Sequence, residues 1–360
     1  MTFPEAVLSR LDVPQVDRLA RGALVLASAA QESALAALLD WTRSAVAASG
    51  PVALLGPDAW AGVEACAVVT MVGSAAGLAE QLPGGDEPLR ALRALERAVG
   101  HRADAVVALN TAVENLLLTV TAAAVAGLPV VDGDGCGRVL PLLEQSVFTL
   151  GGVAVTPAAV ATARGDVLVV DRVGGRVEDV VRPLLPTVGG WAVAACYPMD
   201  GAALAGAVVP GTVSRAVRTA EAEHGERLAA WAPRRLCRGR ITEVDTSRLR
   251  RTGGARTTRS PEVALPSVPT SVVVTESEGL RRRFRLEAHN EILLALADGA
   301  VAASAPDQIL LLSAGRRVLE VEQAEPGVEV EVVVIEAAAP WRTPEGRALA
   351  RRGGPEGDRW

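Results

Sequence analysis

The sequence predicts an α/β protein with two domains: an N-terminal, mostly parallel sheet with flanking helices, and a smaller, β-rich C-terminal domain. Between residues 50 and 134, short β-branched runs alternate with helical segments, a pattern typical of βαβ units. Beyond residue 269, strand-like runs follow one another. The chain has 360 residues, of which 49% are apolar and 22% charged, so it is long and apolar enough to bury a large core.

The N-terminal domain, which we place at 1–235, begins with a helical stretch over 6–48 that is interrupted at 22–30. Apolar runs then predict buried strands at 51–55, 65–71, 103–109 and 128–132. Helices are expected between these strands, at 88–99 with its leucines on one face, and at 114–126, which ends at Gly127 as a C-terminal cap. Shorter strands are expected at 166–173 and 191–197, followed by a helix at 213–231.

A stretch rich in Arg, Thr, Gly and Pro, with little periodicity, predicts a linker at 236–268. The C-terminal domain then covers 269–346, with strands at 271–275, 284–295, 308–312 and 328–336. In the last of these, VEVEVVVIE alternates Val with Glu as a half-exposed strand does. The polar, Gly-rich residues 347–360 are expected to form a surface tail.

Composition excludes several classes of function. The net charge of −6 disfavours binding to nucleic acid or to an anionic membrane, which leaves a small molecule or a protein as partner. All 36 basic residues are Arg, so the chain lacks the Lys that attaches pyridoxal phosphate (PLP) and the Lys of a P-loop nucleotide site. The four cysteines are far apart, which predicts free thiols in the cytoplasm rather than a zinc site. The apolar run at 116–128 is shorter than the roughly 20 residues of a membrane span.

The most distinctive segment, LPVVDGDGCGRVLP at 128–141, follows a predicted buried strand. In a parallel sheet this turn leaves the carboxyl end of the strand, where α/β folds bind ligands. Asp132 and Asp134 have the chemistry of an acid and base pair or of ligands for a divalent metal, and Arg138 that of a carboxylate clamp. The alternating glycines allow a close approach of the backbone to a substrate: Gly133, Gly135 and Gly137. The alternative is a tight turn whose aspartates cap backbone amides. The spacing is not G-x-G-x-x-G, which disfavours NAD.

A second group follows the preceding strand. Asn110, Glu114 and Asn115 lie at the turn into the next helix, on the same edge of the predicted sheet, and are candidates for substrate binding. The alternative is a capping box, with Asn110 or Thr111 as the cap and Glu114 as its partner.

Two further candidates for substrate binding are weaker. Met71 and Ser74 end a third strand, where a plain turn is the alternative. His289, in the C-terminal domain, is a candidate ligand or base, although an isolated His is more often structural.

The order of these segments resembles a known family, the S-methyl-thiohydantoin desulfurases, which are associated with hydantoinase-like enzymes. The most specific match is GLPVVDGDGCGRVLPLLEQ. Supporting matches occur in the family's order along the whole chain: TMVGSAAGLAEQLPGG, GWAVAACYPMDG, PGTVSRA, HNEILLALADG, APDQILLL and WRTPEG.

The resemblance implies an N-terminal α/β domain, a β-rich C-terminal domain, and hydrolytic removal of a methylthio group from a five-membered thiohydantoin ring. Water attacks the ring carbon that bears sulfur, and methanethiol leaves. By this resemblance Asp132 or Asp134 is the base or a metal ligand, and Arg138 orients the substrate.

Two segments depart from the family pattern. Residues Ala27–Gln31 and Thr111–Val113 stand where the family has glycine-rich loops. We therefore keep a second hypothesis, a catalytically degenerate paralogue that serves as a structural or regulatory subunit of an active relative. On either hypothesis the chain is a candidate for a homo-oligomer or a hetero-oligomer. A small-molecule-binding regulator is a third reading, but no DNA-reading motif supports it.

Overall fold

The computed structural model describes residues 8–26, 35–73, 77–78, 81–140, 142–222, 226–245, 270–289, 291–319 and 321–351. These residues form two compact units. Unit 1 comprises the described residues up to Leu24 and those from Leu35 to Ala222. Unit 2 comprises Val25, Leu26 and the described residues from Glu226 onward.

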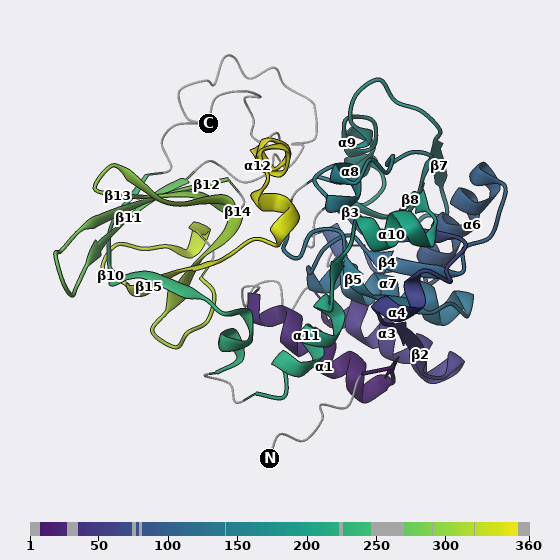
Figure 1. Ribbon diagram of the computed structural model, residues 1–360, viewed down its shortest axis with the longest axis horizontal. Coiled ribbons are helices and arrows are strands. Elements are labelled where there is room, and N and C mark those ends of the chain that lie inside the picture. The colour runs from purple at the N-terminus through teal and green to yellow at the C-terminus, as the bar shows by residue number, and fades with distance from the viewer. Residues whose placement is uncertain are drawn as a thin grey trace. The chain divides into compact units, whose positions relative to one another are not determined.

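Unit 1 is built on a mixed sheet (Figure 1). Its strand order is β1 (Arg10–Leu11), β2 (Val52–Leu55), β5 (Val130–Asp134), β4 (Ala105–Ala108), β3 (Cys66–Gly73), β8 (Trp191–Met199), β6 (Ala158–Ala161) and β7 (Val167–Val170), while β9 (Val209–Pro210) pairs with β5. The strands β2, β5, β4 and β3 are parallel, and the other pairings are antiparallel. The predicted α/β class is confirmed, but the sheet is mixed rather than mostly parallel.

Helices cover both faces of this sheet. The first face is covered by α1 (Val13–Ala23), α3 (Ala36–Ser49), α6 (Glu87–Val99), α7 (Val113–Ala126) and α11 (Thr212–Thr219). The second is covered by α4 (Pro57–Trp60), α8 (Val147–Leu150), α9 (Val177–Val181), η2 (Arg182–Thr187) and α10 (Gly201–Gly206). Strand residues alternate between the faces, so that Val106 packs in the first core and Val107 in the second.

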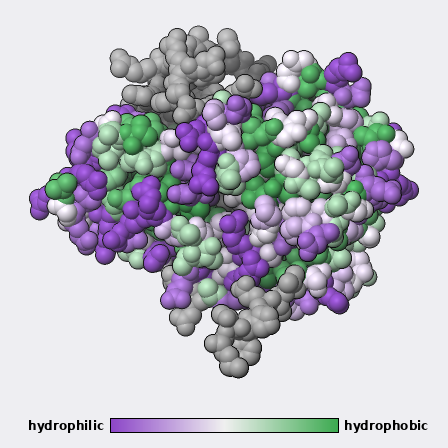
Figure 2. All heavy atoms as spheres, viewed as in Figure 1, coloured by the Kyte–Doolittle hydropathy of each residue, from purple (hydrophilic) through white to green (hydrophobic). Residues whose placement is uncertain are grey.

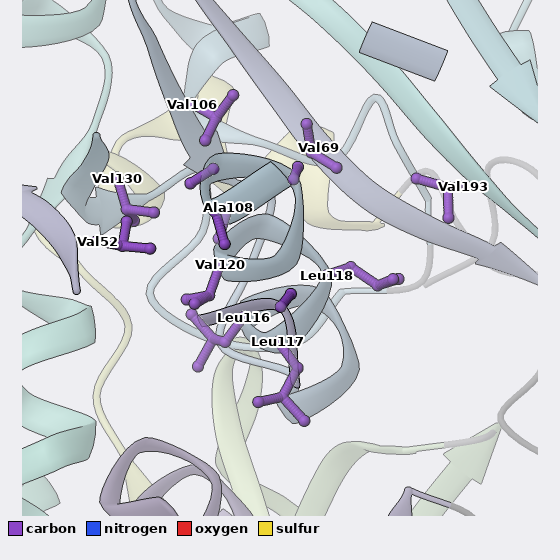
Figure 3. Packing of buried hydrophobic residues seen from close by; sticks show 14 of the residues in the cluster. Val52, Val69, Val106, Ala108, Leu116, Leu117, Leu118, Val120, Val130 and Val193 are labelled. Carbon is purple, nitrogen blue, oxygen red and sulfur yellow. The ribbon is translucent and has the colours of Figure 1, made fainter. Parts of the chain in front are cut away.

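Helix α7 is the centre of the first core, as Figure 3 shows. Its side chains are buried almost all round because the sheet lies on one side and α3 on another. Leu116 and Val120 of the helix belong to the same core cluster as the strand residues Val106 and Val130, all labelled in Figure 3. The helix ends at Gly127, whose φ of 70° is left-handed, as the sequence predicts.

Unit 2 is a closed antiparallel barrel of β10 (Arg234–Asp245), β11 (Thr270–Glu276), β12 (Arg283–His289), β13 (Glu291–Ala297), β14 (Ala300–Ser313) and β15 (Glu329–Ile335). The predicted alternation of β15 is confirmed, since Val330, Val332 and Val334 lie in the barrel core. Its Glu329 and Glu331 instead pair with arginines of β10. The shorter helical elements are η1 (Leu24–Leu26), η3 (Arg227–Trp231), η5 (Val321–Gln323), η6 (Ala339–Arg342) and α12 (Pro344–Arg351).

The structure differs from the sequence prediction at the linker and the tail. Residues 236–245 belong to strand β10, whose inward Cys237 and Ile241 alternate with outward arginines that obscure the strand pattern. The rest of the predicted linker, 246–268, lies outside the described residues. Residues 347–351 are part of α12 because Leu349 and Ala350 are buried, whereas 352–360 are not described.

Two other predicted elements are each divided. The expected strand 284–295 is β12 and β13, joined across residue 290, and the expected helix 213–231 is α11 and η3. Within the described ranges, none of the helices has the length and hydropathy needed to cross a bilayer.

Candidate active site at the carboxyl edge of the sheet

The predicted convergence of strand ends is found in unit 1. Strands β3, β4 and β5 are parallel neighbours, so their carboxyl ends lie at one edge of the sheet. Helix α7 begins at this edge because it follows β4, and α11 begins there because it follows β9, which pairs with the end of β5. The acidic, glycine-rich turn after β5 therefore lies close to the first turns of two helices.

Asp132 connects β5 to α11. Its carboxylate Oδ1 accepts a hydrogen bond from the backbone N–H of Ser214 at 2.9 Å. Its backbone carbonyl accepts another from the N–H of Gly211 at 2.8 Å. Asp132 therefore caps an amide that is distant in the sequence, whereas the alternative interpretation expected aspartates that cap neighbouring amides of a tight turn.

Asp134 is fully buried, with 0% of its surface exposed. Its Oδ1 accepts hydrogen bonds from the backbone N–H groups of Cys136 at 2.6 Å and Gly137 at 2.5 Å. Its Oδ2 makes no hydrogen bond of regular geometry to any residue that the structure describes. Burial raises the pKa of Asp134 to about 6, although the Thr212 hydroxyl, the two amides and the Arg215 charge each oppose that rise.

Thr212 and Arg215 complete the surroundings of Asp134. Thr212 is fully buried at the start of α11, close enough for its hydroxyl to stabilise the Asp134 carboxylate. Arg215 lies one turn later in α11. Burial lowers its pKa below the ordinary value for arginine, although the charges of Asp134 and Asp132 oppose that fall. Sequence reasoning gave these residues no role, although the PGTVSRA segment that contains them was noted as a family match.

The glycine turn is held by close packing. The N–H of Gly135 donates to the carbonyl of Ala108 at 3.1 Å, and a Cβ on Gly135 would lie 2.5 Å from the ring of Phe148. Gly137 has a φ of 70°, which favours glycine. Gly133 pairs with Pro210 of β9. Gly133 and Gly135 therefore lie close to protein atoms, and the predicted approach of the turn to a substrate stays a prediction. Arg138 is 3% exposed, and its Nε donates to the carbonyl of Val139 at 3.1 Å.

Tyr197 of β8 supports this turn from the second face. Its hydroxyl donates to the carbonyl of Leu143 at 2.8 Å, accepts from the Ser146 hydroxyl at 2.9 Å, and lies 2.6 Å from the Thr149 hydroxyl. Its ring packs on Phe148, with 5.4 Å between the centroids. Tyr197 also has a φ of 50°, which is uncommon for a residue other than glycine. Sequence reasoning gave this residue no role, although the family match GWAVAACYPMDG contains it.

Three of the other candidates come together. The side-chain Oδ1 of Asn115 accepts hydrogen bonds from the backbone N–H of Met71 at 2.8 Å and from the Thr70 hydroxyl at 2.9 Å. Its Nδ2 donates to Oδ1 of Asn110 at 2.7 Å. Both asparagines are at least 95% buried. They join the ends of β3 and β4 to the start of α7.

Glu114 does not form the alternative capping box. Helix α7 begins at Val113, and its N-cap, Ala112, makes no side-chain capping hydrogen bond. Asn110 instead accepts a hydrogen bond from the N–H of Ala112 at 2.9 Å, the geometry of an Asx turn. Glu114 is half-buried, and burial raises its pKa.

The remaining candidates stay predictions. Ser74 and residues 27–31 lie outside the described residues. His289 belongs to β12 of unit 2, and its side chain is not among those described.

A divalent metal does not fit the aspartates as they stand. Asp132 and Asp134 each commit Oδ1 to backbone amides. In the part of the chain that the structure describes, no group of three or more His, Cys, Asp or Glu side chains is arranged to hold a metal. We derive no chemical step through a metal.

The fold and this edge define a class: a mixed α/β unit with a buried, acidic glycine turn, followed in the chain by a small antiparallel barrel. A family model described as S-Me-THD-like, N-terminal domain, matches residues 14–172, and one described as S-Me-THD-like, C-terminal domain, matches residues 173–357. The chain therefore belongs to the S-Me-THD-like family, as its resemblance to the S-methyl-thiohydantoin desulfurases predicts.

The fold also matches a solved structure. The X-ray crystal structure of a protein from Chromobacterium violaceum, from a structural genomics consortium, covers 95% of this chain and 94% of its own, with a TM-score of 0.67 and 22% identity. At that identity the similarity establishes the fold alone. No curated protein matches the chain.

Proposed function

We propose that this protein is a hydrolase that acts on a small five-membered cyclic amide or S-methyl-thiohydantoin-type ring and releases methanethiol by attack of water. Family membership supports this class of substrate. The observation that carries the proposal for this chain is Asp134, a buried carboxylate at the carboxyl edge of the parallel strands with a raised pKa.

Asp134 has the properties of a general base. One oxygen is held by two backbone amides, which fixes the carboxylate, while Oδ2 makes no regular hydrogen bond among the described residues. A pKa of about 6 makes this group a stronger base than an ordinary Asp, yet leaves it ionised at neutral pH. A carboxylate of this kind suits removal of a proton from water.

The reaction balances without a cofactor. Water adds to the ring carbon that bears the methylthio group, and Asp134 takes the proton from the attacking water. The carbon–sulfur bond breaks, and Asp134 passes its proton to the leaving methanethiolate. The remaining proton of the added water moves to the ring nitrogen, and the ring carbon becomes a carbonyl. Negative charge develops on the ring during attack, and the arginines near the turn, Arg138 and Arg215, are the groups we propose to stabilise it.

The other predicted residues take supporting parts in this proposal. Asp132 orients α11 and with it Thr212, whose hydroxyl faces Asp134. Asn110 and Asn115 hold the neighbouring strand ends, and with Met71 they form the wall of the substrate site. The free, buried cysteines agree with our proposal of a cytoplasmic protein.

The subunit hypothesis stays as the second candidate because of one observation. Both aspartates of the turn accept hydrogen bonds from backbone amides, as purely structural caps do. A degenerate paralogue that keeps its fold retains these bonds without turnover.

The test is an activity assay on the full chain. S-methylated thiohydantoins are incubated with the purified protein, methanethiol is measured with a thiol reagent, and ring opening of hydantoins is followed in parallel. We expect methanethiol release that falls by a factor of about 100 or more in Asp134→Asn. The matched control is Asp58→Asn, at an exposed aspartate in α4, which is expected to leave the rate unchanged.

Two results separate the candidates. Absence of turnover by the chain alone, with turnover when an active relative is added, supports the subunit hypothesis. Absence of turnover under both conditions contradicts the proposed substrate class.

A further inference from the structure

Two exposed apolar side chains of unit 1 lie on the hairpin of β6 and β7, and others lie on elements near its turn. Val167 and Val169 lie on β7 itself. Leu82 is exposed and lies two residues before Gly84. Gly84 packs against the hairpin turn, since a Cβ added to it would lie 3.0 Å from the carbonyl oxygen of Ala163. Val180 and Leu184 belong to α9 and η2, which cover the second face of the sheet, and Arg164 of the turn donates to the carbonyl of Thr187 at the end of η2 at 3.0 Å. The exposed pair on β7, Val167 and Val169, lies on a strand at the edge of the sheet, where apolar side chains favour pairing with another strand.

Strand β7 is an edge of the sheet. It pairs with β6 and ends the strand order of unit 1 (Figure 1). The opposite edge, β1, is only two residues long, and its Leu11 is fully buried. Edge strands of soluble proteins are usually short or charged, because an unpaired edge strand can bind a strand of another molecule. The apolar sequence of β7, VLVV, lacks that protection. Figure 2 shows green hydrophobic atoms among the surface residues at the β7 end of unit 1.

The hydrogen-bonding groups of Val167 and Val169 point away from β6. The N–H of Thr162 donates to the carbonyl of Asp166 at 3.0 Å, so this is a hydrogen-bonded pair of the antiparallel ladder. Alternation makes Val160 with Leu168 the next hydrogen-bonded pair. The backbone groups of Val167 and Val169 lie between such pairs and face outward. No other described residue donates to them or accepts from them across that edge.

We propose that β7 pairs antiparallel with β7 of a second copy of this chain, with Val169 opposite Val169, so that two sheets become one. The charged residues that flank β7 favour this register over the neighbouring one. With Val169 at the twofold axis, Asp166 of each copy lies opposite Arg172 of the other, and both residues are exposed. A register shifted by two, with Val167 opposite Val169, places Arg164 opposite Arg172 instead, and like charges there oppose pairing.

The first experiment measures the mass of the full chain in solution by sedimentation equilibrium. The wild type is expected to be a dimer. Val169→Lys places two lysines opposite one another and is expected to weaken dimerisation by about tenfold or more. The matched control is Val125→Lys, because Val125 lies on α7 and is 39% exposed, compared with 42% for Val169.

The second experiment tests the register. All four native cysteines are buried, so a single introduced cysteine reacts selectively. A short bifunctional maleimide is expected to cross-link Val169→Cys chains in pairs and to leave Val125→Cys chains single. Asp166→Arg and Arg172→Asp are each expected to weaken the dimer, and the double variant to restore it.

Three outcomes overturn the proposal. A wild type that is monomeric at its highest soluble concentration has no such interface. A dimer that Val169→Lys leaves unchanged uses another surface. Recovery of β7 bound to a different protein, with no self-association, assigns the edge to that partner.

Discussion

The Asp132 carboxylate and the backbone N–H of Ser214 are 2.9 Å apart, although 82 positions separate them in the sequence. Through this bond the end of β5 caps the first turn of α11. The same strand carries Asp134 two residues later, and α11 carries Thr212 and Arg215 beside it. The cap thus fixes the helix that forms the surroundings of the proposed base.

Removal of this cap has a predictable cost. Asp132→Ala is expected to lower the free energy of unfolding by about 1 kcal/mol, because the Ser214 amide loses its partner. Asp132→Asn keeps an acceptor oxygen and is expected to remain close to the wild type. Urea unfolding of both variants measures the difference. Equal stability of the alanine variant and the wild type contradicts a capping role.

Because of Asp134, the free energy of unfolding is expected to fall as the pH rises. Its pKa is about 6 in the folded protein and near the ordinary aspartate value of 3.8 in the unfolded chain. Between these values the folded state binds more protons than the unfolded state, so this carboxyl group destabilises the fold progressively as pH rises through that range. The full effect is about 3 kcal/mol above both pKa values.

The variant Asp134→Asn isolates this effect. Asparagine retains an oxygen for the amides of Cys136 and Gly137 but does not ionise. The difference in unfolding free energy between the variant and the wild type is expected to rise by about 3 kcal/mol, in favour of the variant, between about pH 4 and pH 8. Urea unfolding of both proteins at the two pH values gives the comparison. A stability difference that is the same at both contradicts the raised pKa.

The packing of Phe148 on the glycine turn allows a steric test. Gly135→Ala places a Cβ about 2.5 Å from the Phe148 ring and is expected to cost about 1–3 kcal/mol of unfolding free energy. Phe148→Leu in the same chain is expected to relieve part of that clash. Gly206→Ala is the control, since no atom lies within 4 Å of the added Cβ there. Similar thermal unfolding of the two alanine variants goes against the close contact.

The hydroxyl of Tyr197 connects Leu143, Ser146 and Thr149. Tyr197→Phe keeps the ring contact with Phe148 but removes these hydrogen bonds, and is expected to cost about 1–3 kcal/mol. A double-mutant cycle with Thr149→Val is expected to give a coupling energy of about 1 kcal/mol. A coupling of zero means that the short contact between the two hydroxyls contributes nothing to stability.

The edge of the sheet that carries the candidate site was predictable from local sequence. Alternating strands and helices predict parallel pairing, and parallel pairing brings Met71, Asn110 and Asp134 to one edge. The residues that surround Asp134 at this edge were not predictable. Thr212 and Arg215 reach Asp134 because β9 pairs with β5, a contact between distant segments that no local period encodes.

Two elements of unit 2 were not predictable from the sequence for a different reason. The sequence predicts a linker over 236–245 of strand β10 because arginines occupy several outward positions, and only the closure of the barrel makes the inward residues, Cys237 and Ile241, a strand face. The sequence predicts a tail over 347–351, the last part of helix α12, because the polar composition there obscures two buried residues, Leu349 and Ala350.

The most direct measurement of the central claim is the pH–rate profile of methanethiol release by the wild type and by Asp134→Asn. With Asp134 as the base, the wild-type rate falls on the acidic side with an apparent pKa near 6, and the variant loses activity by a factor of about 100 or more. A variant that keeps the wild-type rate and profile contradicts the assignment of Asp134 as the base.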